Sequence, residues 1–241
     1  MATPFKPIIA LTPEQAKALD AHLNDFTAAD LESVRRKLPR LTPEEIAWLH
    51  CRLSVARHDV NGKLLAINLA FELTQIRPEM AAENTAKIRE RISMVRQEMI
   101  NFIRSIEQVL GVPPKGTEQA RPLAAVQEEE LGDGLNSITP EDNAVIQGHL
   151  AKVTPELVAW LYSRLAVAEG QVLAELAAFQ TAADLIRQNP SRADAPECQM
   201  FQRVKVIEHA LLDFTIEFEH RLSFPDKSQA MMQERVPFAK L

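Results

Sequence analysis

The sequence predicts an all-α protein in which two copies of a long antiparallel helical hairpin pack as a pseudo-twofold four-helix bundle, with additional short helices. Its composition favours helix, because only seven of the 241 residues are glycine and residues that lose little rotamer freedom in a helix are abundant. A duplicated phrase and a recurring helix-start pattern are the other two supporting observations. The 46% hydrophobic content is sufficient for a buried core.

The phrase LTPEEIAWLHCRLSVA at residues 41–56 recurs as VTPELVAWLYSRLAVA at residues 153–168. The offset of 112 residues between the two phrases also aligns Trp160 with Trp48, Pro190 with Pro78, and Phe214 with Phe102. Similarity at one fixed offset indicates an internal duplication. We therefore expect a first helical repeat at 1–115, an acidic connector containing Pro and Gly at 116–137, and a second repeat with a C-terminal tail at 138–241.

Five sequence frames begin like helices. They start at Thr12, Thr27, Thr42, Thr139 and Thr154. Threonine caps the first N–H groups, the proline that follows it in four of the frames suits the first helical position, and acids favour this end of the helix dipole. Glu45 completes a capping box with Thr42. We expect short helices after Thr12, Thr27 and Thr139, with one short helix fewer in the second copy.

The frames at Thr42 and Thr154 continue into long helices. Apolar residues recur at steps of three and four until Pro78, where proline disfavours helix, so the first long helix is roughly 34 residues. A coiled-coil-like seam from Ile88 to Val109 predicts the second helix of the hairpin. Each hairpin has an apolar stripe that the other can cover, and the alternative is two separate lobes. We expect Trp48 and Trp160 to be equivalent core anchors.

One cluster of candidate metal ligands lies in the last long helix. His209, Asp213, Glu217 and His220 are spaced by four, four and three residues, which places them on one helix face. A dinuclear carboxylate site needs a second ExxH motif, which the chain lacks. The aligned residues of the first copy are Gln97, Asn101, Ser105 and Gln108, which indicates a face that simply contacts water. We predict neither a metal nor another cofactor.

Charged residues that recur in both copies have a structural interpretation. Arg52 and Glu107 lie near opposite ends of the first hairpin, as do Arg164 and Glu219 in the second, so an ion pair within each hairpin is expected. The alternative is that Arg52 and Arg164 select a protein partner.

Known catalytic signatures are missing from the sequence. It contains no GxSxG motif, no phosphate-binding glycine loop and no dinucleotide fingerprint. Cys51 and Cys198 are not at equivalent positions, so they predict no disulfide framework. These observations predict a protein that is not an enzyme.

The expected function is a non-enzymatic protein–protein interaction module, of scaffold, adaptor, chaperone or inhibitor type, which acts through long helix faces and an apolar tail. The candidate tail residues are Met231, Met232 and Phe238. The alternative is a metal-binding helical-bundle enzyme or carrier that uses the histidine and carboxylate cluster. The expected partner is another protein, and a homodimer is a second expectation.

Two further classes of partner are not expected. A net charge of −6 argues against nucleic acid. No apolar run approaches the roughly 20 residues that cross a bilayer, and the N-terminal residues do not resemble a signal peptide. We therefore expect a cytoplasmic protein that does not contact a membrane.

Overall fold

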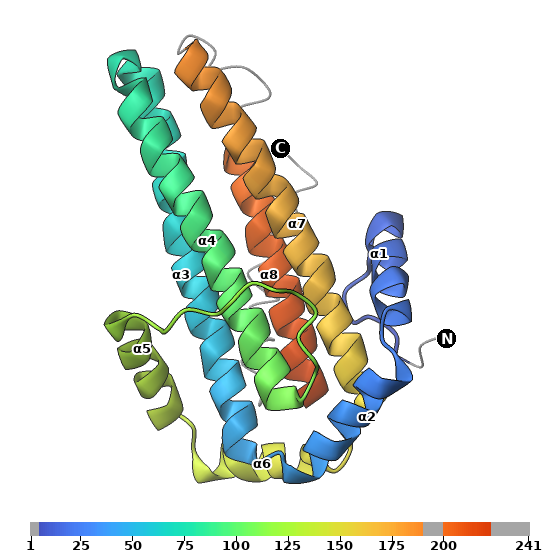
Figure 1. Cartoon of the computed structure of the whole chain (residues 1–241). Helices are drawn as coiled ribbons and strands as arrows, with labels where there is room; N and C mark the ends of the chain where they lie inside the picture. Colours follow the sequence, from blue (N-terminus) through green and yellow to red (C-terminus); the bar gives the residue numbers. More distant parts are fainter. Residues whose placement is uncertain (1–4, 190–199, 223–241) are drawn as a thin grey trace.

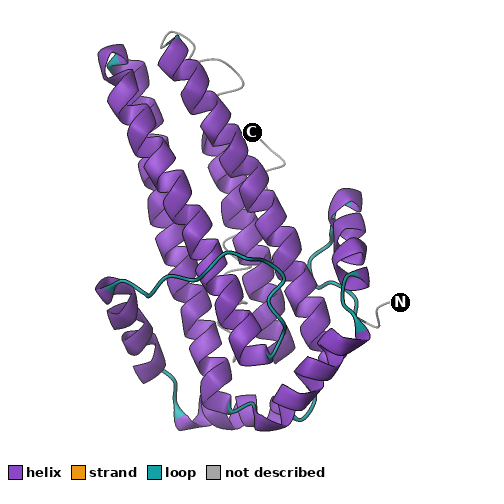
Figure 2. Cartoon of the chain, in the orientation of Figure 1, coloured by secondary structure: helices purple, strands orange, loops and turns teal. Residues whose placement is uncertain are grey.

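The computed structural model describes residues 5–189 and 200–222. These residues form helices and loops and contain no strand (Figure 2), which confirms the predicted all-α fold class. The long helices are α3 (Pro43–Ile76), α4 (Ala81–Leu110), α7 (Pro155–Gln188) and α8 (Met200–Leu222). The short ones are α1 (Pro13–Asn24), α2 (Ala28–Lys37), α5 (Ala125–Asn136) and α6 (Pro140–Leu150), with the 3-10 turns η1 (Leu38–Arg40) and η2 (Pro78–Met80).

The predicted helix starts are confirmed. All five threonines that begin the frames are N-caps, and each side chain accepts a hydrogen bond from the backbone N–H three residues later. At the start of α3, Thr42 and Glu45 form the expected capping box, with N–H to side-chain oxygen distances of 3.0 and 3.2 Å. Both α3 and α7 are 34 residues long and begin 112 residues apart. Strong local capping therefore fixes where these helices begin.

Helix α5 corrects one prediction, because the second half of the chain has as many short helices as the first. It begins and ends 112 residues after α1, inside the predicted connector 116–137. Its N-cap is Ala124, which has no hydroxyl, but the Gln127 side chain still accepts a hydrogen bond from the Ala124 N–H at 3.0 Å. In the same way, the Gln15 side chain accepts a hydrogen bond from the Thr12 N–H at 2.8 Å. The helix was missed because its threonine signal is absent.

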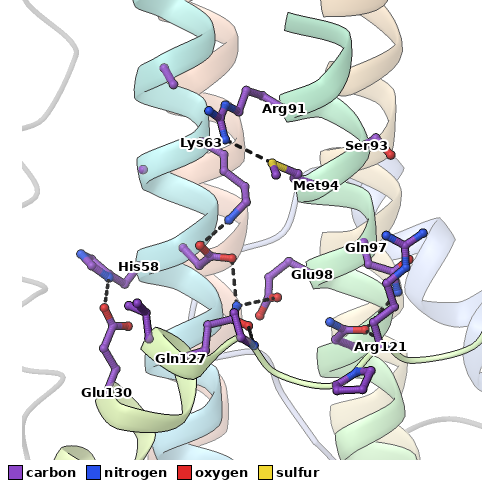
Figure 3. A pocket seen from close by; sticks show the side chains of 17 residues that line it. His58, Lys63, Arg91, Ser93, Met94, Gln97, Glu98, Arg121, Gln127 and Glu130 are labelled. Atoms are coloured by element: carbon purple, nitrogen blue, oxygen red, sulfur yellow. Dashed lines mark hydrogen bonds and ion pairs between the residues drawn. The ribbon is translucent and has the colours of Figure 1, made fainter. Parts of the chain in front are cut away.

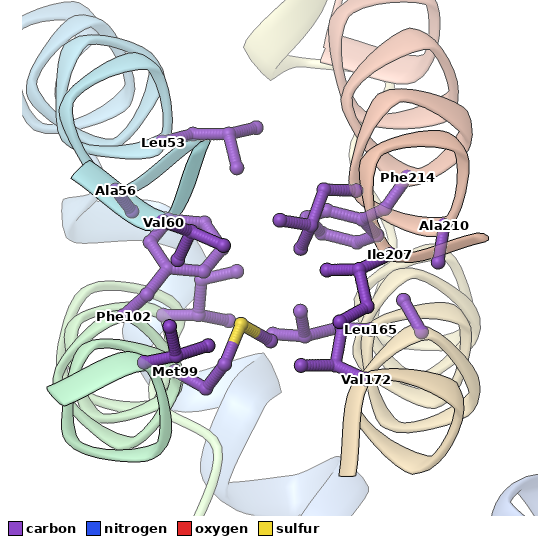
Figure 4. Packing of buried hydrophobic residues seen from close by; sticks show 14 of the residues in the cluster. Leu53, Ala56, Val60, Met99, Phe102, Leu165, Val172, Ile207, Ala210 and Phe214 are labelled. Carbon is purple, nitrogen blue, oxygen red and sulfur yellow. The ribbon is translucent and has the colours of Figure 1, made fainter. Parts of the chain in front are cut away.

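The four long helices lie side by side (Figure 1). Helix α3 packs along α4 and α8, and α7 packs along α4 and α8, so the two hairpins contact each other. A single hydrophobic cluster draws buried residues from all four helices (Figure 4). At its centre Phe102 and Phe214 meet edge to face, with ring centroids 6.2 Å apart. These two rings lie 112 residues apart, at positions that the sequence offset aligns.

The short helices that precede each long hairpin in the chain cover the other long hairpin. Helices α1 and α2 pack against α7, whereas α5 and α6 pack against α3. Figure 1 shows α1 and α5 on opposite sides of the long helices. The one buried residue of α1 is Leu19, and the one buried residue of α5 is Leu131, at the aligned position. Each half of the chain therefore supplies the outer layer for the other half.

Helix α4 ends where Gly111 takes a left-handed conformation with φ of 71°. A Cβ at this position would stand 2.6 Å from Cβ of Lys37, so only glycine fits between α4 and the end of α2. Among the described residues, no helix has the combination of length and apolar character that a bilayer span requires.

Two glycines of α5 test how closely this helix approaches α3. A Cβ at Gly134 would stand 3.2 Å from Sγ and 3.3 Å from Cβ of Cys51, whereas a Cβ at Gly132 would meet nothing within 4 Å. Alanine in place of glycine inside a helix stabilises by about 1 kcal/mol where nothing obstructs it. We expect Gly132→Ala to show this gain in urea denaturation. Gly134→Ala should be less stable than Gly132→Ala by about 1 kcal/mol, because the Cβ of Cys51 cannot yield without its helix. Equal stability of the two variants would contradict the close packing of α5 on α3.

Candidate functional site

Helix α3 has an exposed row of large aliphatic side chains, which we call the outer stripe. It consists of Leu65, Leu69, Leu73 and Ile76, whose exposed fractions are 69%, 53%, 37% and 74%. Steps of four, four and three residues place them on one side of the helix. The buried residues Leu64, Ile67 and Phe71 belong to the opposite side, which faces the core. The outer stripe is therefore a second apolar face of α3.

The same side of α3 is covered nearer its N-terminus. Cys51 and Val55 are buried there against Leu131 of α5. From Val55 the steps of three and four residues continue through His58 and Gly62 to Leu65. Figure 1 shows α5 beside only the N-terminal part of α3. The outer stripe therefore continues an interface that α5 occupies lower on the helix.

The outer stripe has no counterpart of similar character on α7. The aligned positions there are Ala177, Thr181, Leu185 and Gln188, so small or polar residues replace three of the four aliphatic ones. Both helices have the same bounds relative to the offset of 112 residues. The difference is therefore one of side chains and not of helix length.

A cavity of about 670 Å³ lies next to the outer stripe, between α3, α4 and the segment 121–130 (Figure 3). Its floor is formed by a bridge of polar groups: the amide nitrogen of Gln127 lies 3.0 Å from Asp59 Oδ2 and 3.0 Å from Glu98 Oε2. Asp59 also pairs with Lys63. At the edge of the cavity, His58 Nδ1 lies 3.3 Å from Glu130 Oε1 of α5. The polar bridge thus ties α5 to both helices of the first hairpin.

Under this bridge lies a buried ion pair. Arg52 Nη1 is 2.7 Å from Glu98 Oε1, and the two side chains are 1% and 4% exposed. The predicted pairing of Arg52 with Glu107 is wrong, because Glu107 pairs with Arg104 and accepts a hydrogen bond from Tyr162 at 2.7 Å. Since the ion pair is removed from water, loss of either partner would leave an uncompensated buried charge.

Two buried hydrogen bonds connect the first half of the chain to the second at aligned positions. His50 Nε2 lies 2.8 Å from Glu219 Oε1, and Tyr162 is the counterpart of His50 just as Glu107 is the counterpart of Glu219. The predicted pairing of Glu219 with Arg164 is thus replaced by a pairing with His50. Arg164 lies inside the protein, where burial lowers the pKa of its guanidinium, and the Glu217 carboxylate opposes this.

A second cavity, of about 230 Å³, contains three carboxyl groups. Glu107, Glu118 and Glu169 line it together with Tyr162 and Arg104. Burial, followed by the negative charges of Glu118 and Glu107, raises the pKa of Glu169. Burial and the hydrogen bond to Glu107 raise the pKa of Tyr162. Each proton is thus held more tightly than in water.

The candidate metal ligands do not converge. Glu217 is fully buried and accepts hydrogen bonds from the backbone N–H groups of Ile8 and Ile9, at 2.6 and 3.4 Å. His209 and His220, by contrast, are exposed. Residues 5–189 and 200–222 contain no group of three or more His, Cys, Asp or Glu side chains placed to hold a metal ion.

The remaining candidates lie in different environments. Both Arg52 and Arg164 are buried, so a partner could reach them only if the packing around them opened. The apolar residues Met231, Met232 and Phe238 lie outside the described residues. Trp160 is fully buried, with the Arg221 guanidinium 4.9 Å from its ring, whereas Trp48 is only partly buried against the core and α5. The two indoles therefore have unequal burial.

Comparison of the chain with protein-family models, curated proteins and solved structures finds no match. The geometry of the surface is therefore the basis of any functional assignment.

The outer stripe has a signal in the sequence that was not among the predictions above. Leucine recurs every four residues at Leu65, Leu69 and Leu73. This series is separate from the buried series of Leu64, Ile67 and Phe71. A helix with two apolar faces is buried on both or exposes one of them. Sequence periodicity could therefore have predicted two faces, but not how far along α3 a short helix covers the second.

The ion pair of Arg52 and Glu98 can be tested by a double-mutant cycle. Arg52→Met should lower the free energy of unfolding by about 3 kcal/mol or more, because it leaves Glu98 buried without its cation. The double variant Arg52→Met with Glu98→Met should be more stable than Arg52→Met alone, since no buried charge remains. Urea denaturation of the wild type, both single variants and the double variant measures this. Additive losses would contradict the pairing.

The raised pKa of Glu169 predicts a pH dependence of stability. A carboxyl group that binds its proton more tightly in the folded chain makes the protein lose stability as the pH rises above the ordinary carboxyl pKa. Glu169→Gln cannot ionise, so it should melt at a higher temperature than the wild type at neutral pH. This advantage should vanish below about pH 4, where the wild-type carboxyl is protonated in both states. Thermal melts between about pH 3 and pH 8 test it, and a difference that does not vary with pH would contradict it.

Proposed function

We propose that the protein is a non-enzymatic helical protein–protein interaction module, of scaffold, adaptor, chaperone or inhibitor type, and that the outer stripe of α3 binds a helix of its partner. The observation that carries this proposal is the exposure of four large aliphatic side chains on one face of α3, where α7 has mostly small or polar residues. Contiguous exposed apolar surface marks interaction sites. Isolated exposed apolar residues do not need such an explanation.

Helix α5 supplies the template for this binding mode. It lies on the same side of α3 and buries Leu131 against Cys51 and Val55. An amphipathic helix of a partner would continue this layer toward Ile76, with apolar residues at steps of three and four. The chain therefore already contains one helix that packs on this side of α3.

The apolar contribution of the outer stripe is limited. Covering one leucine or isoleucine fully contributes about 1.5–3 kcal/mol, and association costs roughly 4–15 kcal/mol in lost freedom. Four partly exposed side chains therefore support a weak complex at most. Further contacts, from polar groups beside the stripe or from the apolar tail with Met231, Met232 and Phe238, would be needed for tight binding.

We also propose that the architecture is a duplicated hairpin pair with pseudo-twofold symmetry, packed as a four-helix bundle. Four pairs of helices support this, because α1 and α5, α2 and α6, α3 and α7, and α4 and α8 begin or end 112 residues apart. The reciprocal hydrogen bonds of His50 with Glu219 and of Tyr162 with Glu107 add independent support. On this proposal one copy of the repeat kept a covered or polar surface and the other acquired a binding face.

Matched charge insertions on α3 and α7 test the binding face. We expect Leu65→Glu with Leu69→Glu to abolish partner binding, because the carboxylates would be desolvated against the partner's apolar residues. Ala177→Glu with Thr181→Glu places the same charges on the aligned, exposed positions of α7 and should leave binding unchanged. The measurement is recovery of partner proteins on the immobilised chain, quantified for the wild type and both double variants.

The two double variants should melt within a few degrees of the wild type, because all four sites are exposed. Equal recovery by the α3 variant and the α7 variant would overturn the proposed binding face. Sedimentation velocity over a range of concentrations separates a homodimer from a heterologous complex. Self-association lost only in the α3 variant would identify a second copy as the partner.

A further inference from the structure

The cavity between α3 and α4 opens beside the outer stripe. Its α3 wall includes Gly62 and Ala66, which alternate along the helix with Leu65 and Leu69 of the stripe. A Cβ at Gly62 would meet nothing within 4 Å, so this part of α3 leaves room for an approaching group. Met94 of α4 is part of the opposite wall and is partly exposed. A helix bound on the outer stripe would thus border the cavity along one side.

Some of the charged groups around this cavity have no partner of opposite charge. Each of its three carboxylates has a partner: Asp59 pairs with Lys63, Glu98 with Arg52, and Glu130 with His58. Arg91 and Arg121 form no ion pair with any described residue, and Arg91 donates only to the thioether sulfur of Met94 at 3.2 Å. In Figure 3 Arg91 lies near Lys63 and Arg121 near Gln97, on either side of α4. Two guanidinium groups therefore have no anionic partner.

The aligned arginine in the second half of the chain has the acidic partner that Arg91 lacks. Arg203 aligns with Arg91, and its guanidinium pairs with Glu175 at 2.8 Å. The residue aligned with Glu175 is Lys63, so the first half has a cation where the second has the carboxylate. Arg91 therefore has a cation at the position where Arg203 has its acidic partner. A sulfur atom is a weak acceptor for a guanidinium, whereas a carboxylate is a strong one.

We propose that the partner helix is acidic, and that a carboxylate of this helix pairs with Arg91 when its apolar face covers the outer stripe. Helix α5 carries the same combination of features: it is apolar at Leu131, acidic at Glu128, Glu129, Glu130 and Asp133, and packed on the same side of α3. Its Glu130 already pairs with His58 at the edge of the cavity. The inference rests on the proposed function and adds the charge of the partner to it.

The experiment uses the full chain and two labelled synthetic helices. Both are about 20 residues long, or about 30 Å as a helix, which is close to the length of α3 that α5 leaves uncovered. Both carry leucine at steps of three and four. One carries glutamate at its flanking positions, and the other carries lysine there. Fluorescence anisotropy at about 50 mM and about 500 mM salt gives each dissociation constant. The net charge of −6 by itself favours the basic peptide, so preference for the acidic one requires local cations.

We expect the acidic peptide to bind the wild type more tightly than the basic one, by about tenfold at low salt. Arg91→Gln should remove this preference and most of the salt dependence. The control, Arg40→Gln, removes one exposed arginine charge outside the cavity and should leave both unchanged. Melting temperatures of both variants verify that they fold.

The outcomes separate the two proposals. If both peptides bind equally, or if the arginine variant still prefers the acidic one, the charge inference is overturned. Loss of both peptides from Leu65→Glu with Leu69→Glu would then still support the stripe as the binding face. If neither peptide binds the wild type at either salt concentration, the proposed helix-binding function is overturned together with the inference.

Discussion

The structure depends on a mismatch between the lengths of its helices. The 34 residues of α3 and of α7 span about 50 Å, whereas the 12 residues of α1 and of α5 span about 18 Å. A short helix can therefore cover the outer side of a long helix over less than half its length. The chain meets this constraint differently in its two halves, because α7 presents Ala177, Thr181 and Gln188 beyond the covered part, whereas α3 presents Leu65, Leu69 and Ile76.

Buried polar groups fix how the long helices align. Aliphatic side chains pack with similar energy in several registers, but a buried carboxylate needs a specific partner. Glu219 finds it in His50, and Glu107 in Tyr162, across the boundary between the two halves. A shift of one hairpin by a helical turn would break both contacts and leave buried groups without hydrogen bonds. The exchange of the short helices, with α1 on α7 and α5 on α3, secures the same alignment from outside.

The helix starts that the sequence predicted depend on interactions between neighbouring residues. The ion pairs and the exposed face depend on contacts between distant parts of the chain. Threonine caps set where α1, α2, α3, α6 and α7 begin, and proline supports four of these starts, because capping depends on neighbouring residues only. Helix α5 was missed because Ala124 lacks the hydroxyl that marks the other starts. The ion pairs were predicted wrongly, since the sequence spacing shows which stretch of α4 lies opposite Arg52 but not whether its guanidinium reaches Glu98 or Glu107. The unpaired Arg91 required a comparison with Arg203 in its folded surroundings.

The cations beside the outer stripe also bear on which partner it excludes. An exposed row of leucines by itself favours contact between two copies of the chain. If the two copies paired with their stripes parallel, Lys63 and Arg91 of one copy would lie near the same cations of the other, and their repulsion would oppose the apolar gain. An acidic helix meets the opposite situation, because it gains from both the leucines and the guanidinium groups. On the proposed binding mode, the combination of an apolar row with an unpaired arginine therefore suits an acidic partner better than a parallel pair of copies.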